Sequence, residues 1–370
     1  MPEVLSGRSL EHRARRHACG RRPEVSGTGA LKQGEVPRRA RVRLARRDGR
    51  RSAVVLVLAL CSSAVTLQAQ PPSSAKVPAP EGFRVFMITD MEGMASVVFN
   101  REIISGWEGE RYRDQSSPDY WTHYRELFTR EVNAAIEGAR TGGAGSFVVN
   151  EGHGGNLFAN LLPWQLDTAA LLVRGWPKPM VMSAGIDSTA GAAFFIGAHA
   201  NAGSEGVISH SYAFDQLTVN GRSLNETGIN ALVLGEYGVP IVMVTGDDVV
   251  TGEAREQLGP QVMTVVTKYA LSRSAAVTYS PAVVRQMLRD SAAAAVRRAM
   301  GGEFRPFTLE KPYRIEFTLR RSYPQEYVAG VDAITGFSLT KSGDRTWQFT
   351  TNDARELARL LDAIELVVLR

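Results

Sequence analysis

The chain has 370 residues, of which 44% are hydrophobic, so it can bury one large core or two moderate ones. Its net charge of +5 is unevenly distributed. Residues 1–52 hold fourteen Arg and one Lys against five acidic residues, whereas residues 53–370 hold 28 basic and 33 acidic residues. The basic balance therefore belongs to the N-terminal segment, and we expect no nucleic-acid partner.

The first 82 residues have the pattern of an export signal. Residues 1–52 are an Arg-rich leader, either disordered or the product of a mis-assigned start. Residues 53–69 combine an apolar run with small residues up to Ala69, which is typical of a secretory signal peptide. The Pro-rich residues 70–82 form a linker. We expect an exported protein, periplasmic or secreted, with no stable membrane domain after cleavage; an uncleaved N-terminal anchor is the alternative.

Both cysteines, Cys19 and Cys61, lie in this N-terminal segment. Cleavage after Ala69 would leave a chain without cysteine, which excludes a disulfide framework and a thiolate metal site. Any metal must then be bound by oxygen and imidazole ligands.

The remaining chain alternates strands and helices. An apolar strand at 84–89, a helix at 120–140 and a strand at 147–150 give the β–α–β order of a parallel sheet. The further predictions are short strands at 193–197 and 206–209, a hairpin turn at Asn220-Gly221, a helix at 226–237, a strand at 240–245, a helix at 281–300, strands at 314–319 and 347–350, and a helix at 353–369.

These elements predict an α/β fold, with a mostly parallel sheet flanked by helices. We place the metal-binding catalytic domain at residues 83–271 and a smaller C-terminal α+β domain at residues 272–370.

Three histidines each follow a predicted strand: His153, His199 and His210. In an open α/β sheet, ligands bind beyond the carboxyl ends of the strands, so the three can converge there. Asp90 and Glu92 add two carboxylates at the end of the first strand. In an extended chain residues i and i+2 point the same way, so both can reach one metal or a close pair of metals.

Several catalytic motifs are missing from the sequence. It has no His-Glu-x-x-His helix, no Gly-x-Ser-x-Gly elbow, no phosphate-binding lysine loop and no dinucleotide fingerprint. A metal-activated water is then the simplest nucleophile.

Seven separated segments together resemble the D-aminopeptidases of the M55 metallopeptidase family, in order and approximate spacing. They are Thr89–Gly93 (TDMEG), Asn150–His153 (NEGH), Ile196–Ala200 (IGAHA), Gly206–Ser211 (GVISHS), Asn225–Ala231 (NETGINA), Thr245–Asp248 (TGDD) and Leu271–Ala275 (LSRSA).

The resemblance implies two Zn²⁺ per subunit, a short peptide substrate and a homo-oligomer. It implies that Asp90 bridges the metals and that the other ligands are Glu92, His153, His199 and Glu226. It also implies that His210 is catalytic, as the family's nucleophile. On physical grounds a general acid/base or oxyanion-stabilising role for His210 is equally open.

Four further residues are candidates for support or substrate contact. Asp247 and Asp248 either orient the ligand imidazoles or cap the following helix. Asn230 and Arg273 are candidates for binding a substrate carboxylate or for contacting the metal-ligating side chains from outside. The family's Asn-Asp-Ser-His stretch reads Asn-Glu-Gly-His here, an Arg is replaced by Asn201, and a Gly by Asn225.

We therefore expect an exported, zinc-dependent D-aminopeptidase that hydrolyses short peptides with an N-terminal D-residue, such as D-Ala-D-Ala. Two alternatives stay open at this point. One is a two-metal amidase or phosphoesterase with another substrate, and the other is a non-catalytic, metal-containing peptide-binding protein.

Overall fold

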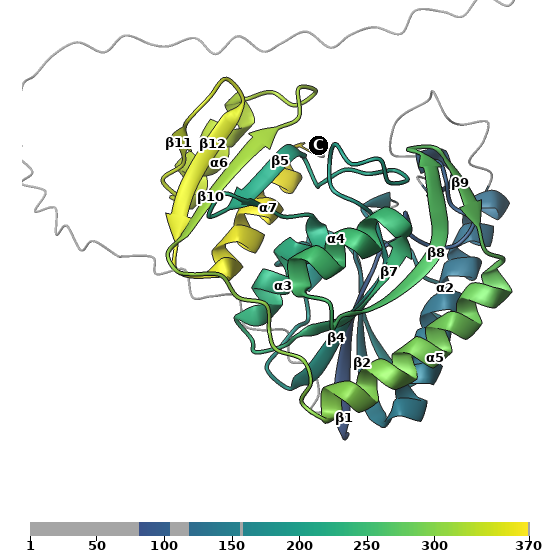
Figure 1. The fold of residues 1–370 in the computed structure, drawn as a ribbon. Coiled ribbons are helices and arrows are strands. Elements are labelled where there is room, and N and C mark those ends of the chain that lie inside the picture. The colour runs from purple at the N-terminus through teal and green to yellow at the C-terminus, as the bar shows by residue number, and fades with distance from the viewer. Residues whose placement is uncertain (1–80, 104–117, 156–157, 369–370) are drawn as a thin grey trace, which may run out of the picture. The chain divides into compact units, whose positions relative to one another are not determined.

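The computed structural model describes residues 81–103, 118–155 and 158–368 (Figure 1). The predicted leader and signal peptide, and the linker up to residue 80, lie outside the described residues. Within the described part of the chain, no helix has the length and apolarity needed to cross a membrane.

The larger sheet has seven strands in the order β3-β2-β1-β4-β7-β8-β9. All neighbouring strands are parallel except β8 and β9. The strands are β1 (Phe83–Thr89), β2 (Ala144–Glu151), β3 (Ala170–Val173), β4 (Ala190–Ala198), β7 (Ile241–Asp247), β8 (Met263–Ser272) and β9 (Ala275–Thr278).

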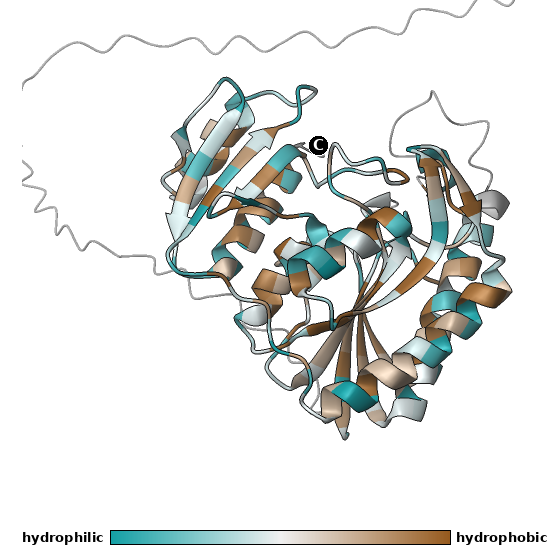
Figure 2. Ribbon diagram, viewed as in Figure 1, coloured by the Kyte–Doolittle hydropathy of each residue, from teal (hydrophilic) through white to brown (hydrophobic). Residues whose placement is uncertain are grey.

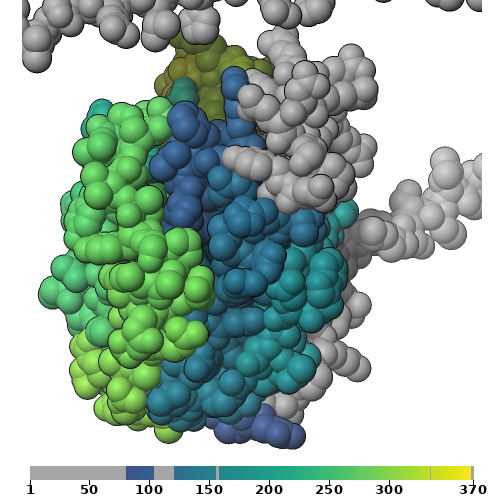
Figure 3. Space-filling view, turned by 90° about the vertical axis from the view of Figure 1, so that its right-hand side faces the viewer, coloured from purple at the N-terminus to yellow at the C-terminus, as the bar shows by residue number. Residues whose placement is uncertain are grey.

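Helices cover both faces of this sheet, as its apolar strands require (Figures 1 and 2). On one face α2 (Pro118–Gly142) and α5 (Pro281–Met300) lie side by side (Figure 3). On the other lie α3 (Glu226–Gly235) and α4 (Asp248–Leu258). Strand β1 supplies both cores, because alternate residues point to opposite faces. Its Val85 and Met87 pack toward α2 and α5, and its Phe86 and Ile88 pack toward α3 and α4.

The smaller sheet is antiparallel and has the order β11-β12-β10-β5-β6. Its core includes residues of α3 and of two C-terminal helices. The elements are β5 (Phe214–Val219), β6 (Arg222–Ser223), β10 (Tyr313–Leu319), α6 (Glu326–Thr335), β11 (Thr340–Lys341), β12 (Thr346–Thr351) and α7 (Ala354–Val368). Two short helices, α1 (Asn100–Ile103) and η3 (Val181–Ser183), complete the described elements.

The predicted fold class is confirmed, and the hairpin turn lies where the sequence placed it. Val219 pairs with Arg222, and Asn220 and Gly221 between them have φ values of 54° and 78°. These left-handed values are those that favour Asn-Gly in a two-residue hairpin.

The predicted strand at 206–209 is wrong, because the segment forms a turn. Ile208 has a φ of 53°, which no strand residue adopts. The N–H of Val207 donates to Asp247 Oδ2 (2.6 Å), and that of Ile208 donates to the carbonyl of Arg273 (2.9 Å). Backbone N–H groups that would pair within a sheet are thus bound by the last residue of β7 and by the turn after β8.

Both sheets take strands from each side of residue 271. Strands β5 and β6 precede it and lie in the smaller sheet, whereas β9 and α5 follow it and join the larger layer. The division into domains at this residue stays a prediction.

Candidate active site

The candidate site lies at the carboxyl ends of β1, β2 and β4. The chain runs from β1 through β2 to β3 on one side and then returns to β4 on the other side of β1. Such a change of direction opens a crevice beyond the strand ends. Asp90 directly follows β1, His153 lies two residues beyond β2, and His199 directly follows β4. The sheet therefore brings these three predicted residues together.

Asp90 lies at the centre of the cluster. Its Oδ1 is 3.5 Å from His153 Nδ1, and its Oδ2 is 3.5 Å from His199 Nε2. Glu92 Oε2 is 3.0 Å from the same nitrogen of His153, and Glu226 Oε2 is 3.5 Å from the same nitrogen of His199. Two groups of three potential metal ligands thus share Asp90, and within each group the ligand atoms lie within 4.8 Å of one another.

All five side chains are buried, and their charges perturb one another. Burial raises the pKa of Asp90 well above its ordinary value. Burial alone would lower the pKa of His199, but the carboxylates of Glu226 and Asp90 raise it to about 10. The pKa of His153 is likewise raised well above its ordinary value, because the charge of Glu92 outweighs the effect of burial. The cluster therefore attracts positive charge.

The donor set fits a metal pair. Asp90 Oδ2 is buried and accepts no hydrogen bond within the described residues, which leaves a lone pair for a cation. Each imidazole is held through its other nitrogen, since His153 Nε2 lies 2.9 Å from the carbonyl oxygen of Ile103 and His199 Nδ1 lies 3.1 Å from that of Ala200. Such anchoring fixes the tautomer of metal-ligating histidines. Three carboxylates and two imidazoles are ligands that suit Zn²⁺.

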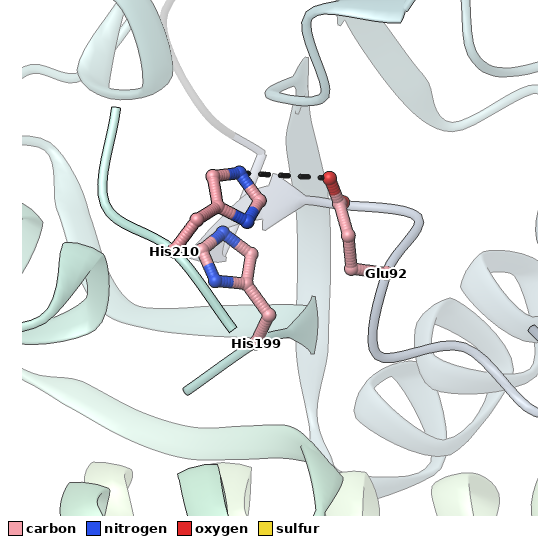
Figure 4. A group of neighbouring side chains, drawn as sticks. All are labelled: Glu92, His199 and His210. Carbon is pink, nitrogen blue, oxygen red and sulfur yellow. Dashed lines mark ion pairs between the residues drawn. The ribbon is translucent and has the colours of Figure 1, made fainter. Parts of the chain in front are cut away.

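His210 lies against this cluster but is bound differently. Its ring stacks on that of His199, with centroids 3.9 Å apart and planes 9° from parallel. Its Nδ1 lies 2.7 Å from the carbonyl oxygen of Ile208, so it is the protonated nitrogen. Its Nε2 faces Glu92 Oε1 at 3.8 Å (Figure 4). Burial, and then the charge of His199, lower the pKa of His210 to about 4. With Nδ1 protonated, Nε2 is the ring nitrogen that carries a lone pair.

Two buried lysines support the loops that carry the ligands. The ammonium group of Lys268, on β8, donates to the carbonyl oxygens of Glu92 (2.5 Å), Met94 (3.0 Å) and Val97 (2.5 Å). It therefore fixes the path of the chain after β1.

Lys178 does the same for the end of β2. Its ammonium group donates to Asn150 Oδ1 (2.5 Å) and to the carbonyl oxygen of Glu151, two residues before His153.

Close backbone packing joins the ends of β1 and β4. The N–H of Asp90 donates to the carbonyl of Ile196 (2.8 Å). Gly197 has a φ of 80°, and a Cβ atom there would lie 2.0 Å from the carbonyl oxygen of Asp90. A glycine is required at this position both by its left-handed backbone and by this approach.

The remaining sequence candidates support the site rather than join the cluster. Asp247 is the N-cap of α4, where its Oδ1 accepts from the N–H of Val250 (2.8 Å). Asp248 Oδ1 accepts from the N–H of Ala270 (2.8 Å). Asp247 thus caps α4 through Oδ1 and accepts from the N–H of Val207 through Oδ2.

Arg273 and Asn230 contact the surroundings of His210 and Glu226. Arg273 Nη2 donates to the carbonyl of Ser209 (2.5 Å), next to His210. Asn230 Nδ2 donates to the hydroxyl of Tyr212 and to the carbonyl of Glu226, both at 2.8 Å.

The cluster opens into a cavity of about 360 Å³, which is within the usual size of a small-molecule site. The segment that follows β10 and the helix α7 also line it, with Arg320, Tyr323 and Glu365. Sequence reasoning missed these residues. They reach the site only because the smaller sheet packs beside the larger one, and no local motif marks them.

The comparisons with known proteins agree with this geometry. The model of the family Peptidase_M55, described as D-aminopeptidase, matches residues 83–363. The chain therefore belongs to the M55 family of D-aminopeptidases, and it is an enzyme of the metallopeptidase class.

Two relatives illustrate the similarity. The chain is 34% identical over 277 residues to a D-aminopeptidase of Bacillus subtilis (strain 168), covering 74% of this chain and 93% of that protein. It also resembles a solved structure from Bacillus subtilis, described as the Zn-dependent D-aminopeptidase DppA, a self-compartmentalizing protease. That match has a TM-score of 0.67 and 30% identity, and it covers 78% of this chain and 98% of the other.

Proposed function

We propose that the protein is a two-zinc D-aminopeptidase that releases the N-terminal D-residue from short peptides such as D-Ala-D-Ala. In this proposal Asp90 would bind both of two Zn²⁺ ions, Glu92 and His153 would help to hold one of them, and His199 and Glu226 would help to hold the other. The observation that carries it is the pair of buried three-residue groups that share the Asp90 carboxylate. One carboxylate between two sets of ligands is the arrangement that a two-metal hydrolase needs.

The ions would supply Lewis-acid polarisation of the scissile carbonyl and an activated water. The protein itself supplies a proton acceptor in His210. Its protonated Nδ1 is held by the carbonyl of Ile208, so Nε2 is the atom that can accept a proton. An imidazole with this fixed tautomer can accept a proton at Nε2 and then return it to the leaving amine.

Replacing His210 by Ala tests the catalytic assignment. We expect His210→Ala to retain two Zn²⁺ per subunit but to release D-Ala from D-Ala-D-Ala about 10²- to 10⁴-fold more slowly. His123→Ala is the matched control, because His123 is exposed on α2, away from the cluster. Zinc content and D-Ala release are measured on the same samples. Wild-type activity in His210→Ala would contradict the assignment, and zinc-loaded wild type without D-Ala release would contradict the proposed function.

We also propose a homo-oligomer, supported by the self-compartmentalizing relative and by apolar side chains on the β8–β9 hairpin. Tyr269, Leu271 and Val277 are 45%, 70% and 59% exposed there, and a second copy could cover them. Light scattering is expected to give the mass of several subunits; a monomer would contradict this.

Export is proposed from the signal-like residues 53–69. It predicts a mature N-terminus directly after Ala69 in protein recovered outside the cytoplasm. Recovery of the chain only inside the cytoplasm, with residues 1–69 still attached, would contradict it.

A further inference from the structure

Among the described residues that line the cavity, Arg320 is the one cationic residue other than histidine. It directly follows β10, and its N–H donates to the carbonyl of Ala213 (2.9 Å). That contact continues the pairing of β10 with β5, in which Leu319 lies opposite Phe214. Ala213 is three residues after His210 in the sequence, so this backbone hydrogen bond holds Arg320 against the segment that carries His210.

One nitrogen of the Arg320 guanidinium group, Nη2, is buried and has no hydrogen-bond partner within the described residues. No carboxylate of the described residues forms an ion pair with it. A buried guanidinium N–H without an acceptor is costly, so such a group is usually completed by a ligand.

The nearby carboxyl group of Glu365, on α7, lines the same cavity. It forms no ion pair with Arg320 among the ion pairs of the described residues.

The cavity thus contains the metal cluster and, on its wall, a guanidinium nitrogen that has no partner within the described residues. A short peptide whose scissile carbonyl lies at the cluster also carries a carboxylate at its C-terminus. A guanidinium group is planar and can donate two parallel hydrogen bonds to one carboxylate, which makes arginine well suited to bind this group.

We propose that Arg320 binds the C-terminal carboxylate of the substrate and so selects short peptides with a free C-terminus. The inference rests on the proposed aminopeptidase function and deepens it. Arg320 is then a residue that determines substrate specificity. The smaller sheet limits the length of the peptide, because it fixes the position of Arg320 relative to the metal cluster.

Two substrates that share the scissile bond test this role: D-Ala-D-Ala and its C-terminal amide, D-Ala-D-Ala-NH₂. For the zinc-loaded wild type we expect kcat/KM to be about 10- to 100-fold lower on the amide, since hydrogen bonds to charged groups contribute about 1.5–3 kcal/mol. In Arg320→Met the value for D-Ala-D-Ala should fall to that of the amide, mainly through KM, while the value for the amide stays unchanged. Arg320→Lys, which keeps the charge without the fork, should fall between.

Arg321→Met is the matched control, because Arg321 is the exposed neighbour on the same segment. It should leave both substrates unaffected. Equal wild-type rates on the two substrates would overturn the inference, even if the Arg320 variants fail to fold. Equal losses on both substrates in Arg320→Met would also overturn it, because they indicate a structural role. Zinc-loaded wild type that cleaves neither substrate would refute the proposed function and the inference with it.

Discussion

Lys268→Met removes the buried ammonium group that supports the loop after β1. The side chain is fully buried, and its three hydrogen bonds end on the carbonyl oxygens of Glu92, Met94 and Val97. Met has a similar length and no donor, so it fills the space but leaves the three carbonyl oxygens without this partner. The substitution therefore tests whether Lys268 holds Glu92 in place or is merely tolerated in the core.

The expected loss follows from these contacts. Each buried carbonyl oxygen left without its donor costs about 1–3 kcal/mol. Part of this is offset, because the variant no longer has to bury an ammonium group, whose pKa burial lowers to about 8. We expect a net loss of about 3–5 kcal/mol in the free energy of unfolding. Because the loop also carries Glu92, we expect zinc affinity to fall by about 10- to 100-fold.

Urea denaturation and competitive zinc titration measure the two effects. Lys341→Met is the control, since Lys341 is exposed on β11 and its ammonium lies 6.0 Å from the ring centroid of Trp347. Wild-type stability together with wild-type zinc affinity in Lys268→Met would refute the reasoning. Loss of stability without loss of zinc affinity would show that the support does not extend to Glu92.

Two further predictions concern pH and metal removal. Burial raises the pKa of Glu131 to about 8, whereas its ordinary value is 4.5, so between these pH values the unfolded chain loses a proton that the folded chain keeps. The contribution of Glu131 to the free energy of unfolding therefore falls as pH rises through that window. Glu131→Gln should stabilise the protein by more at pH 8 than at pH 5, and the difference should be on the order of a few kcal/mol. An equal effect of the substitution at both pH values in urea denaturation would contradict this. Removing zinc with a chelator should lower the melting temperature, since a ligand at 100 times its Kd contributes about 2.7 kcal/mol, and added zinc should restore it. An unchanged melting temperature after verified loss of zinc would exclude a stabilising metal pair.

The sequence by itself determined the fold class and most of the cluster. An apolar strand that ends in Asp90 and Glu92, and histidines that follow the strands β2 and β4, predict convergence because parallel strands share one edge. These patterns can be recognised within short segments, and the parallel sheet then places the ends of those segments side by side. Glu226 was different: as the first residue of α3 it has only the pattern of a helix-start acid, and the family resemblance supplied its role.

The tertiary structure decided what depends on contacts between distant segments. The turn at 206–209 reads as a strand locally, but Asp247 and the segment at Arg273 hold its backbone in another form. The stacking of His210 on His199 follows from that turn. Arg320, directly after β10, lines the cavity because β10 pairs with β5. The periodicity of a strand fixes which face a side chain points to, but not which other element that face meets. This is why the metal cluster could be predicted from strand ends, whereas the wall that faces the substrate could not.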